Sequence, residues 1–580
     1  MSVSPHPPAP LGDLTPELKY SLQERVEHNL ITLVTKLSAS RFYHESPALQ
    51  SLRNALGTPG IGASLDAKSK DVLTSYSDFV PLTMYSDYAP YVARVIPHSD
   101  THVSNVADVR HLLAPGLPAY VAYSSGTTGS AAKHFLKYPS TVYKPLRWDT
   151  QEAAVKHSGV MCNIACIRLA KVVRLPDAGE KECHDVHIPV AQVSAGGLRA
   201  YLGIEPTEDA YLANHKAPFC ATPFAAWLLP AYGSTVYMNA FFGLIEARVE
   251  CVAMTFSTIL CDAVRLIETH WAEWVIAIEH GSLPEIDELG EYCVKLQLRQ
   301  ITPGSEGFLK KVWPNLVLVS VILSGPYATA LPKLRHVFGP TVTFQSKIYA
   351  ATETVVGFGY DVNDYNLYRL DSSEHIELLE VEQQCSIENL RQPYEVVVTN
   401  NDGLWRYPLN DVVEVAGFSP TDGQPLIRYV GRKDVTFRIH SEFVSQSFLQ
   451  QAVISLSGTL GPISEFTVEP DERKPLRAYG FILELQGELG SNAGQALEQL
   501  KQYMCRNEGY KKCFDINCIG NPTIRIVPAG TFDAYRNRQA DNTMSTPGQV
   551  KIPCAITDSA ARKWLADRVV ADFEIEYGSK

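Results

Sequence analysis

The alternation of short apolar runs with longer helical stretches is the feature that most constrains this fold. Apolar runs that read as buried strands lie near Tyr120, Val317 and Val396. Helical periodicity covers the stretches from Phe256 to Ile278 and from Ala330 to Val337. Such alternation is typical of a layered α/β domain, so we predict β-sheets covered by helices between about residues 120 and 430.

The pattern restarts near residue 431 and predicts a second, smaller unit. A chain of 580 residues with 45% hydrophobic content is too long for one ordinary domain. We therefore predict a large multi-layer N-terminal domain of residues 1–430 and an α+β C-terminal domain of residues 431–580. The C-terminal elements expected are helices at 447–456 and 493–503 and strands at 465–468, 478–485 and 523–527.

Composition excludes several classes of protein. A net charge of -12 and an isoelectric point near 5.8 argue against a general nucleic-acid binder, because phosphate backbones are held by basic surfaces. No uninterrupted apolar run reaches the length of about 18 residues that a membrane helix needs, and the N-terminus does not resemble a secretory signal. The 12 cysteines include no Cys-x-x-Cys pair, which favours free thiols over a zinc site. We expect a cytoplasmic protein without a membrane partner.

A loop rich in small and hydroxyl residues follows the first predicted strand and ends at Lys133. Its hydroxyls belong to Ser124, Ser125, Thr127 and Thr128. Small side chains let backbone N–H groups approach an anion, and the hydroxyls and the lysine add further donors. The order of residues is not that of a Walker A loop. We interpret the segment as a phosphate-binding loop; the alternative is a polar surface turn.

A second motif runs from Thr343 to Glu353, where a strand is expected to end in a loop that bears Tyr349, Thr352 and Glu353. A carboxylate beside a nucleotide can hold Mg²⁺ that bridges phosphate oxygens. The alternative is a solvated acid at a strand end.

A third motif runs from Gly403 to Asp411, in which a glycine turn leads to an aromatic and basic run and then to an acid. Asp411 has the chemistry to accept hydrogen bonds from both hydroxyls of a ribose. The alternative is an ordinary turn residue.

A fourth motif, Arg428 to Asp434, lies at the expected domain boundary. Its charged residues are interpreted as a hinge that responds to bound nucleotide, or otherwise as a solvated linker. Arg432 is the candidate nucleotide contact there.

The order of these motifs is that of adenylate-forming ligases, and within them the chain resembles the Gretchen Hagen 3 acyl acid-amido synthetases. The resemblance extends in order from about residue 30 to residue 556. It rests on residues 80–91, 124–129, 256–260, 268–271, 313–315, 324–325, 349–353, 403–411, 530–533 and 549–551.

This resemblance implies an enzyme that activates a small carboxylic acid with ATP and Mg²⁺ and transfers the acyl group to an amino acid or another amine. It also implies that the C-terminal domain is mobile. The residues carried over are Ser124, Ser125, Thr127 and Thr128 for the phosphates, Ser324, Gly325, Tyr349, Thr352, Asp411 and Arg432 for the rest of ATP, Glu353 for Mg²⁺ and phosphate, and Lys551 for the α-phosphate during adenylation.

One position departs from the pattern of the family. Glu442 and Phe443 stand where an Asp-Lys pair is usual, which removes a cation and bears on the amine partner. Arg147 is the candidate for the acyl carboxylate. Two alternatives stay open: an adenylate-forming ligase with a thiol acceptor, and a nucleotide-binding protein that has lost catalysis. The sequence names neither substrate nor the oligomeric state.

Overall fold

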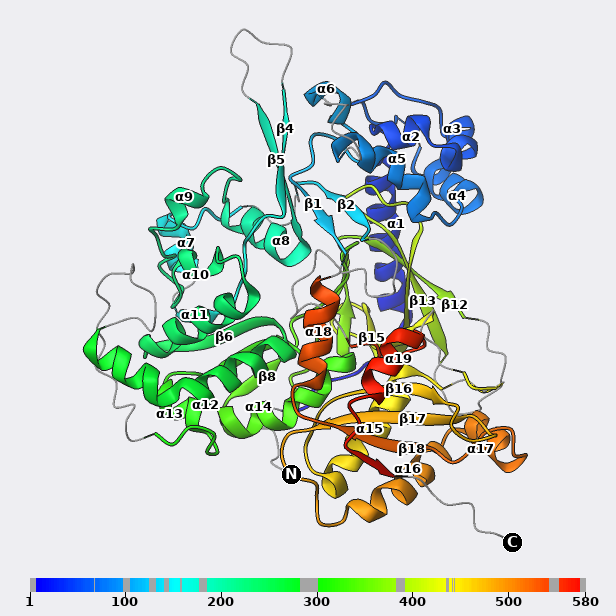
Figure 1. Ribbon diagram of the computed structural model, residues 1–580. Helices are drawn as coiled ribbons and strands as arrows, with labels where there is room; N and C mark the ends of the chain where they lie inside the picture. Colours follow the sequence, from blue (N-terminus) through cyan, green and yellow to red (C-terminus); the bar gives the residue numbers. More distant parts are fainter. Residues whose placement is uncertain are drawn as a thin grey trace.

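Four β-sheets organise the described chain (Figure 1). The computed structural model describes residues 7–573 except 67, 97–104, 125–131, 140–144, 157–158, 177–184, 282–300, 382–391, 434–437, 441, 443 and 542–551. Helices flank the sheets, so the predicted α/β class is confirmed. Within these residues, no helix combines the length and the apolar character needed to cross a membrane.

The N-terminal part is helical. Thr15 caps the first helix by accepting a hydrogen bond from the Leu18 N–H, and Pro16 occupies its first turn. The apolar faces of these helices pack into the same core as the largest sheet, which fixes them against it. The helices are α1 (Pro16–Leu37), α2 (Arg41–Glu45), η1 (Pro47–Leu49), α3 (Gln50–Leu56), α4 (Ser69–Phe79), α5 (Tyr85–Val95) and α6 (Val106–Val109).

The first sheet has the strand order β2-β1-β5-β4. Its strands β1 and β2 form a hairpin, while β4 and β5 extend as a ribbon at the top of Figure 1. The hairpin carries the loop predicted to bind phosphate. The strands are β1 (Tyr120–Tyr123), β2 (His134–Lys137), β4 (Lys171–Leu175) and β5 (Val186–Gln192), and the nearby helices are α7 (Gln151–Lys156), α8 (Val193–Leu202), α9 (Asp209–Leu212) and α10 (Phe224–Trp227).

The second sheet, β3-β6-β7-β8, is parallel throughout. Parallel strands need crossover connections, and long apolar helices supply them and share a core with the strands. The strands are β3 (Val160–Asn163), β6 (Val249–Phe256), β7 (Leu318–Ile322) and β8 (Thr343–Gln345), and the helices are α11 (Tyr232–Ile245), α12 (Ser257–His280), α13 (Phe308–Val312), η3 (Gly325–Ala330) and α14 (Leu331–Phe338).

The third sheet is seven-stranded and antiparallel, in the order β12-β13-β14-β15-β11-β10-β9. Register shifts interrupt β13, β14 and β10, and such bulges bend and twist a sheet. The strands are β9 (Ile348–Ala350), β10 (Val355–Gly359), β11 (Leu367–Leu370), β12 (His375–Glu380), β13 (Pro393–Thr399), β14 (Tyr407–Phe418) and β15 (Pro425–Arg432).

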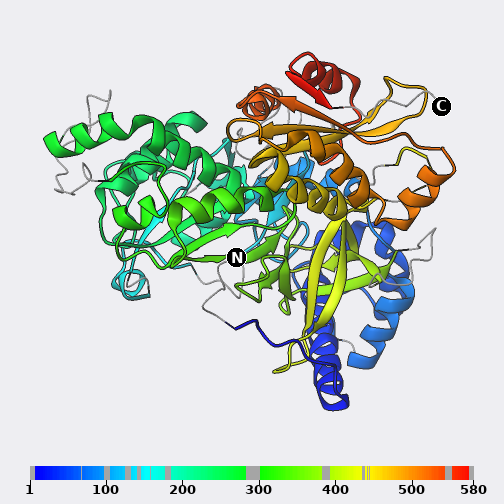
Figure 2. The same cartoon turned by 90° about the horizontal axis from the view of Figure 1, so that it is seen from below.

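The fourth sheet, β16-β17-β18-β19, belongs to the C-terminal part and has its own core. Figure 2 shows this part seated over the junction between the parallel sheet and the seven-stranded sheet. Its mobility and the boundary at residue 430 stay predictions. The elements are α15 (Gln446–Leu460), β16 (Ile463–Asp471), β17 (Ala478–Leu485), η5 (Ala493–Gln495), α16 (Ala496–Met504), α17 (Glu508–Asp515), β18 (Thr523–Val527), α18 (Thr531–Asp541), α19 (Ser559–Ala566) and β19 (Ala571–Phe573).

Candidate nucleotide site

The loop predicted to bind phosphate is closed at its base by a pair of hydrogen bonds. The Ser124 N–H donates to the Lys133 carbonyl at 2.8 Å, and the Lys133 N–H donates to Ser124 Oγ at 3.0 Å. The ammonium of Lys133 lies 5.6 Å from the centroid of the Tyr85 ring. Ser125, Thr127 and Thr128 lie outside the described residues, so their assignment stays a prediction.

Tyr349, Asp411 and Arg432 converge at one point of the seven-stranded sheet. The Tyr349 hydroxyl donates to Asp411 Oδ2 at 2.8 Å, and Arg432 Nε lies 3.4 Å from Asp411 Oδ1. Asp411 and Arg432 are register partners across β14 and β15. Burial and the charge of Asp411 hold the pKa of Tyr349 well above its usual range, so its hydroxyl keeps its proton and acts as the donor.

The expectation that Tyr349 lies in a loop was wrong. Tyr349 lies within β9, not in a loop, because residues 348–350 pair with β10 as a hairpin. Asp411 lies inside the long strand β14, where it pairs with Arg432 of β15, so the alternative of an ordinary turn residue does not apply. Sheet pairing therefore fixes the main chain at Asp411, and the contacts with Tyr349 and Arg432 orient its carboxylate.

Glu353 occupies the turn between β9 and β10, next to Thr352. Its carbonyl accepts hydrogen bonds from Lys137 Nζ at 2.7 Å and from Asn400 Nδ2 at 3.0 Å. Burial raises the pKa of the Glu353 carboxyl, and the charge of Lys137 opposes that rise. Glu353 follows β9, the strand of Tyr349, and the charge of Asp411 raises the pKa of the Glu353 carboxyl further.

Ser324 and Gly325 lie where η3 begins. Ser324 Oγ accepts a hydrogen bond of 2.7 Å from Tyr368, whose ring centroid is 5.5 Å from that of Tyr349. Gly325 has a φ of +56°, which favours glycine. Its carbonyl accepts a hydrogen bond from the Gln450 side chain of α15, so the C-terminal part touches this edge of the site.

The hinge segment is tied to the seven-stranded sheet by the ion pair of Lys433 Nζ with Glu395 Oε2 at 2.7 Å, in addition to the Arg432 contact. Beyond it, the buried carboxylate of Glu442 accepts hydrogen bonds from the Ile439 N–H at 2.7 Å and from the Tyr479 hydroxyl at 2.7 Å. Glu442 therefore anchors the chain after the hinge. Phe443 and Lys551 lie outside the described residues.

Arg147 makes several contacts within the N-terminal part of the chain. Its guanidinium bonds Glu208 Oε1 at 2.8 Å, Asp149 Oδ1 at 3.2 Å and the Gly203 carbonyl at 3.2 Å. These bonds raise the pKa of Arg147 and favour a structural role. Its assignment to the acyl carboxylate stays a prediction.

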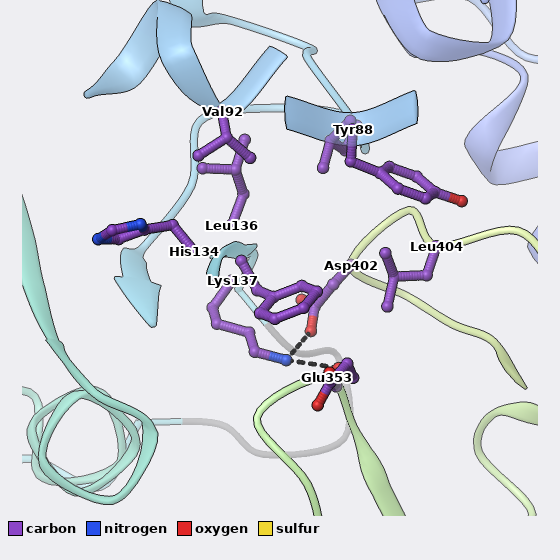
Figure 3. Close-up of a pocket in the computed structure, with 10 residues that line it drawn as sticks. Tyr88, Val92, His134, Leu136, Lys137, Glu353, Asp402 and Leu404 are labelled. Carbon is purple, nitrogen blue, oxygen red and sulfur yellow. Dashed lines mark hydrogen bonds and ion pairs between the residues drawn. The ribbon is translucent and has the colours of Figure 1, made fainter. Parts of the chain in front are cut away.

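Sequence reasoning missed Lys137, Asp402 and Asn400. Lys137 and Asn400 contact the Glu353 carbonyl, and Lys137 also contacts Asp402 (Figure 3). Lys137 Nζ lies 2.9 Å from Asp402 Oδ2, and both residues line a pocket with Glu353, Phe135 and Leu404. A lysine at the end of an otherwise apolar strand and the Asn-Asn-Asp-Gly turn at 400–403 were the available signals.

The donor set fits a nucleotide with Mg²⁺ only if the nucleotide supplies ligands. Within the described residues, no group of three or more His, Cys, Asp or Glu side chains is arranged to hold a metal ion. Mg²⁺ at nucleotide sites takes one or two carboxylates together with phosphate oxygens, and Glu353 provides one such carboxylate. Asp411 provides the paired acceptor oxygens that suit a ribose diol.

Three family models match the chain in order. They are the GH3 family N-terminal domain over residues 60–343, the GH3 family central domain over residues 367–432 and the GH3 family C-terminal domain over residues 446–560. The first two contain Ser124, Ser324, Asp411 and Arg432, whereas residues 349–353 fall between them.

Curated plant proteins match along most of their length. A probable indole-3-acetic acid-amido synthetase from Oryza sativa subsp. japonica is 25% identical over 90% of each chain. A 4-substituted benzoates-glutamate ligase from Arabidopsis thaliana is 23% identical over 85% of this chain and 89% of its own length. The solved structure of the GH3.15 acyl acid amido synthetase covers 96% of each chain with a TM-score of 0.70 at 20% identity, which confirms the fold. The chain thus belongs to the GH3 family, as its motifs had indicated.

Proposed function

We propose that this chain is an ATP-dependent acyl acid-amido synthetase. It adenylates a carboxylic acid and then transfers the acyl group to the amino group of an amino acid or another amine. The observation that carries the proposal is the convergence of Tyr349, Asp411 and Arg432, with Glu353 held nearby in the turn after β9 by Lys137 of β2. The names of the curated GH3 relatives, which are amido synthetases and a glutamate ligase, support it.

The chain's own residues have distinct roles in this proposal. Asp411 accepts hydrogen bonds from the ribose hydroxyls, while Tyr349 flanks the adenine and holds the Asp411 carboxylate in place. Ser324, Gly325 and Thr352 border the nucleotide, and Ser124, Ser125, Thr127 and Thr128 donate to its phosphates. Arg432 adds positive charge next to Asp411, the proposed acceptor for the ribose hydroxyls.

The chemical problem is that a carboxylate is a poor electrophile with a poor leaving group. In-line attack of the acid on the α-phosphate forms an acyl-adenylate and releases pyrophosphate, and it needs positioning and charge neutralisation more than covalent catalysis. Mg²⁺, when bound through Glu353, neutralises phosphate charge. Lys551 does the same at the α-phosphate. The amine nitrogen then attacks the acyl carbon, a C–N bond forms, and AMP leaves.

Two further parts of the proposal concern the whole chain. Residues 431–580 rotate about the hinge between the two half-reactions. This rotation would move Lys551 away from the α-phosphate after adenylation and complete the site for the amine. The nine described cysteines are free, which favours a reducing compartment such as the cytoplasm.

The test is a matrix of carboxylic acids against amino acids, with AMP and pyrophosphate measured and amides identified by mass spectrometry. Indolyl and aryl acids head the panel because the relatives are named for indole-3-acetic acid and for 4-substituted benzoates. Amide and AMP in equal amounts are expected. Coenzyme A as a competing acceptor distinguishes amide from thioester formation, and nucleotide binding without exchange over the whole panel would contradict the proposal.

A further inference from the structure

Glu353 is held from its main chain, and the groups that hold it come from two other parts of the fold. The carbonyl of Glu353 accepts the bonds from Lys137 Nζ at 2.7 Å and from Asn400 Nδ2 at 3.0 Å. The Ala351 N–H donates to the Thr354 carbonyl at 2.8 Å and closes the same turn. A carbonyl that accepts two hydrogen bonds, one of them from an ammonium group, has little freedom to rotate.

The ammonium of Lys137 is itself fixed by Asp402. The Lys137 side chain is only 9% exposed, and its Nζ lies 2.9 Å from Asp402 Oδ2. The other oxygen, Asp402 Oδ1, accepts the Tyr138 N–H at 2.9 Å. The acid therefore binds both the side chain and the main chain at the end of β2, and Figure 3 shows Lys137 between Asp402 and Glu353.

The turn that carries Asp402 is rigid in its own right. Asn400 Oδ1 accepts the N–H of Asp402 at 3.2 Å and that of Leu404 at 3.0 Å. Gly403, at a φ of +93°, lies so close to Leu113 that a Cβ would fall 2.1 Å from the Leu113 carbonyl oxygen. The turn thus provides a fixed base for the Lys137 contact.

Stability alone poorly explains an ion pair between a buried lysine and Asp402, whose side chain is 22% exposed. Desolvation of two charges often cancels their attraction, and an apolar pair of similar volume is frequently as stable. Lys137 is also the last residue of β2, the strand that follows directly after Lys133 at the end of the β1–β2 loop. The pair therefore links the strand of the loop to the turn of Glu353.

We propose that Lys137 and Asp402 are positioning residues that fix the main chain of Glu353 and so orient its carboxylate toward the Mg²⁺-bound phosphates of ATP. The inference rests on the proposed function, because that function gives Glu353 its ligand. Neither Lys137 nor Asp402 touches the reacting atoms in this scheme. Both act through Glu353.

The test compares ATP binding by calorimetry with Mg²⁺ and with EDTA in the full chain. The variants are Lys137→Met, Lys137→Arg, Asp402→Asn, the neutral pair Lys137→Met with Asp402→Asn, Glu353→Gln, and the double variant Lys137→Met with Glu353→Gln. Lys36→Met is the matched control, because Lys36 Nζ donates to Asn401 Oδ1 at 2.7 Å in the same 400–403 turn without touching Glu353.

We expect Mg²⁺ to tighten ATP binding by the wild type, and Lys137→Met to lose about tenfold of that gain, because small displacements of a ligand group are costly. Its affinity in EDTA should stay within about twofold of wild type. Lys137→Arg should restore part of the gain, and Lys36→Met should keep it. Lys137→Met added to Glu353→Gln should cause no further loss, since both changes act on one contact.

Two outcomes would overturn the inference. One is additive losses in the Lys137→Met, Glu353→Gln double variant. The other is an unchanged Mg²⁺ gain in Lys137→Met with only a lower unfolding temperature. If Lys137→Met does not fold, the Mg²⁺ gain in ATP affinity is measured instead in the neutral pair and in Asp402→Asn. The amide oxygen that Asp402→Asn introduces still accepts the Tyr138 N–H, so the end of β2 keeps this bond. Failure of the proposed function looks different: the wild type itself would bind no ATP with Mg²⁺, and the inference would fall with it.

Discussion

The hydroxyl of Tyr349 and the carboxylate of Asp411 are joined at 2.8 Å although their strands lie four steps apart in one sheet. In a flat sheet, four steps of strand spacing amount to about 19 Å between β9 and β14. The seven-stranded sheet must therefore curl until its β9 edge meets β14. Tyr368 and Tyr429, with ring centroids 5.5 Å and 5.7 Å from that of Tyr349, lie inside this curl.

Asp411→Asn should weaken ATP binding by about tenfold or more, because the proposed ribose acceptor loses its charge. Tyr349→Phe should weaken it only a few-fold and lower the free energy of unfolding by about 1 kcal/mol, since Asp411 keeps its contact with Arg432. Calorimetric titration with ATP measures the affinities, and urea unfolding measures the stabilities.

Tyr360→Phe is the control for the tyrosine, because that hydroxyl donates to the Pro10 carbonyl at 2.9 Å, away from the site. It should leave ATP affinity unchanged. Wild-type affinity in Asp411→Asn would show that Asp411 does not contact the nucleotide.

Gly403→Ala should destabilise the chain much more than Gly57→Ala. The two glycines have nearly the same φ, +93° and +90°, so the backbone strain of an alanine is matched at about 1 kcal/mol. Only at Gly403 does the new Cβ meet the Leu113 carbonyl, whereas nothing lies within 4 Å at Gly57. We expect a difference of at least about 2 kcal/mol in urea unfolding.

Gly403→Ala should also weaken Mg²⁺-dependent ATP binding, because Asn400 and Asp402 share its turn, and Gly57→Ala should not. Equal unfolding midpoints for the two variants would mean that the 400–403 turn relaxes without cost.

Arg265→Glu should loosen helix α18 from helix α12. Arg265 pairs with Asp262 of its own helix and with Asp533 of α18, and Arg536 pairs with Asp533 and Glu465 within the C-terminal part. A glutamate at position 265 would face two carboxylates. Because Arg265 is 49% exposed, the loss of global stability should stay near 1 kcal/mol or below, so the readout is local amide hydrogen exchange in α18.

Arg248→Glu is the matched charge reversal, since Arg248 is exposed and pairs with Glu246 in the N-terminal part. It should leave exchange in α18 as in the wild type. Unchanged exchange in Arg265→Glu as well would mean that these ion pairs do not hold α18 in place.

Sequence patterns predicted the elements with strong local signals. The strands expected at 478–485 and 523–527 are β17 and β18, because continuous apolar runs mark buried strands. The loop expected at Tyr349 was wrong, since a strand as short as β9 carries little periodicity. The curl of the large sheet depends on bulges that no local pattern announces.

The contacts of Lys137 and Asp402 that hold Glu353 were not predicted for a related reason. Lys137 and Asp402 lie 265 positions apart, and a single lysine or aspartate reads equally well as a surface charge. Only the three-dimensional pairing of β2 with the 400–403 turn gives them a common role. Local patterns therefore pointed to the proposed nucleotide ligands but not to the residues that we propose position Glu353.

Glu374 should make stability fall as pH rises from about 4.3, the ordinary glutamate value, to about 8. Burial, then the charges of Asp402 and Asp371, raise its pKa to about 8, while bonds from Asn401 oppose the rise. In that window the folded chain keeps a proton that the unfolded chain has lost, so the free energy of unfolding declines with pH. The half-buried Lys36, whose pKa is lowered by burial, acts in the opposite direction at higher pH. Glu374→Gln should reduce the decline in the free energy of unfolding between pH 5.5 and about 8, as measured by urea unfolding. Glu380→Gln, an exposed change in β12, is the control. Equal slopes of this free energy against pH in the wild type and both variants would exclude Glu374 as the cause.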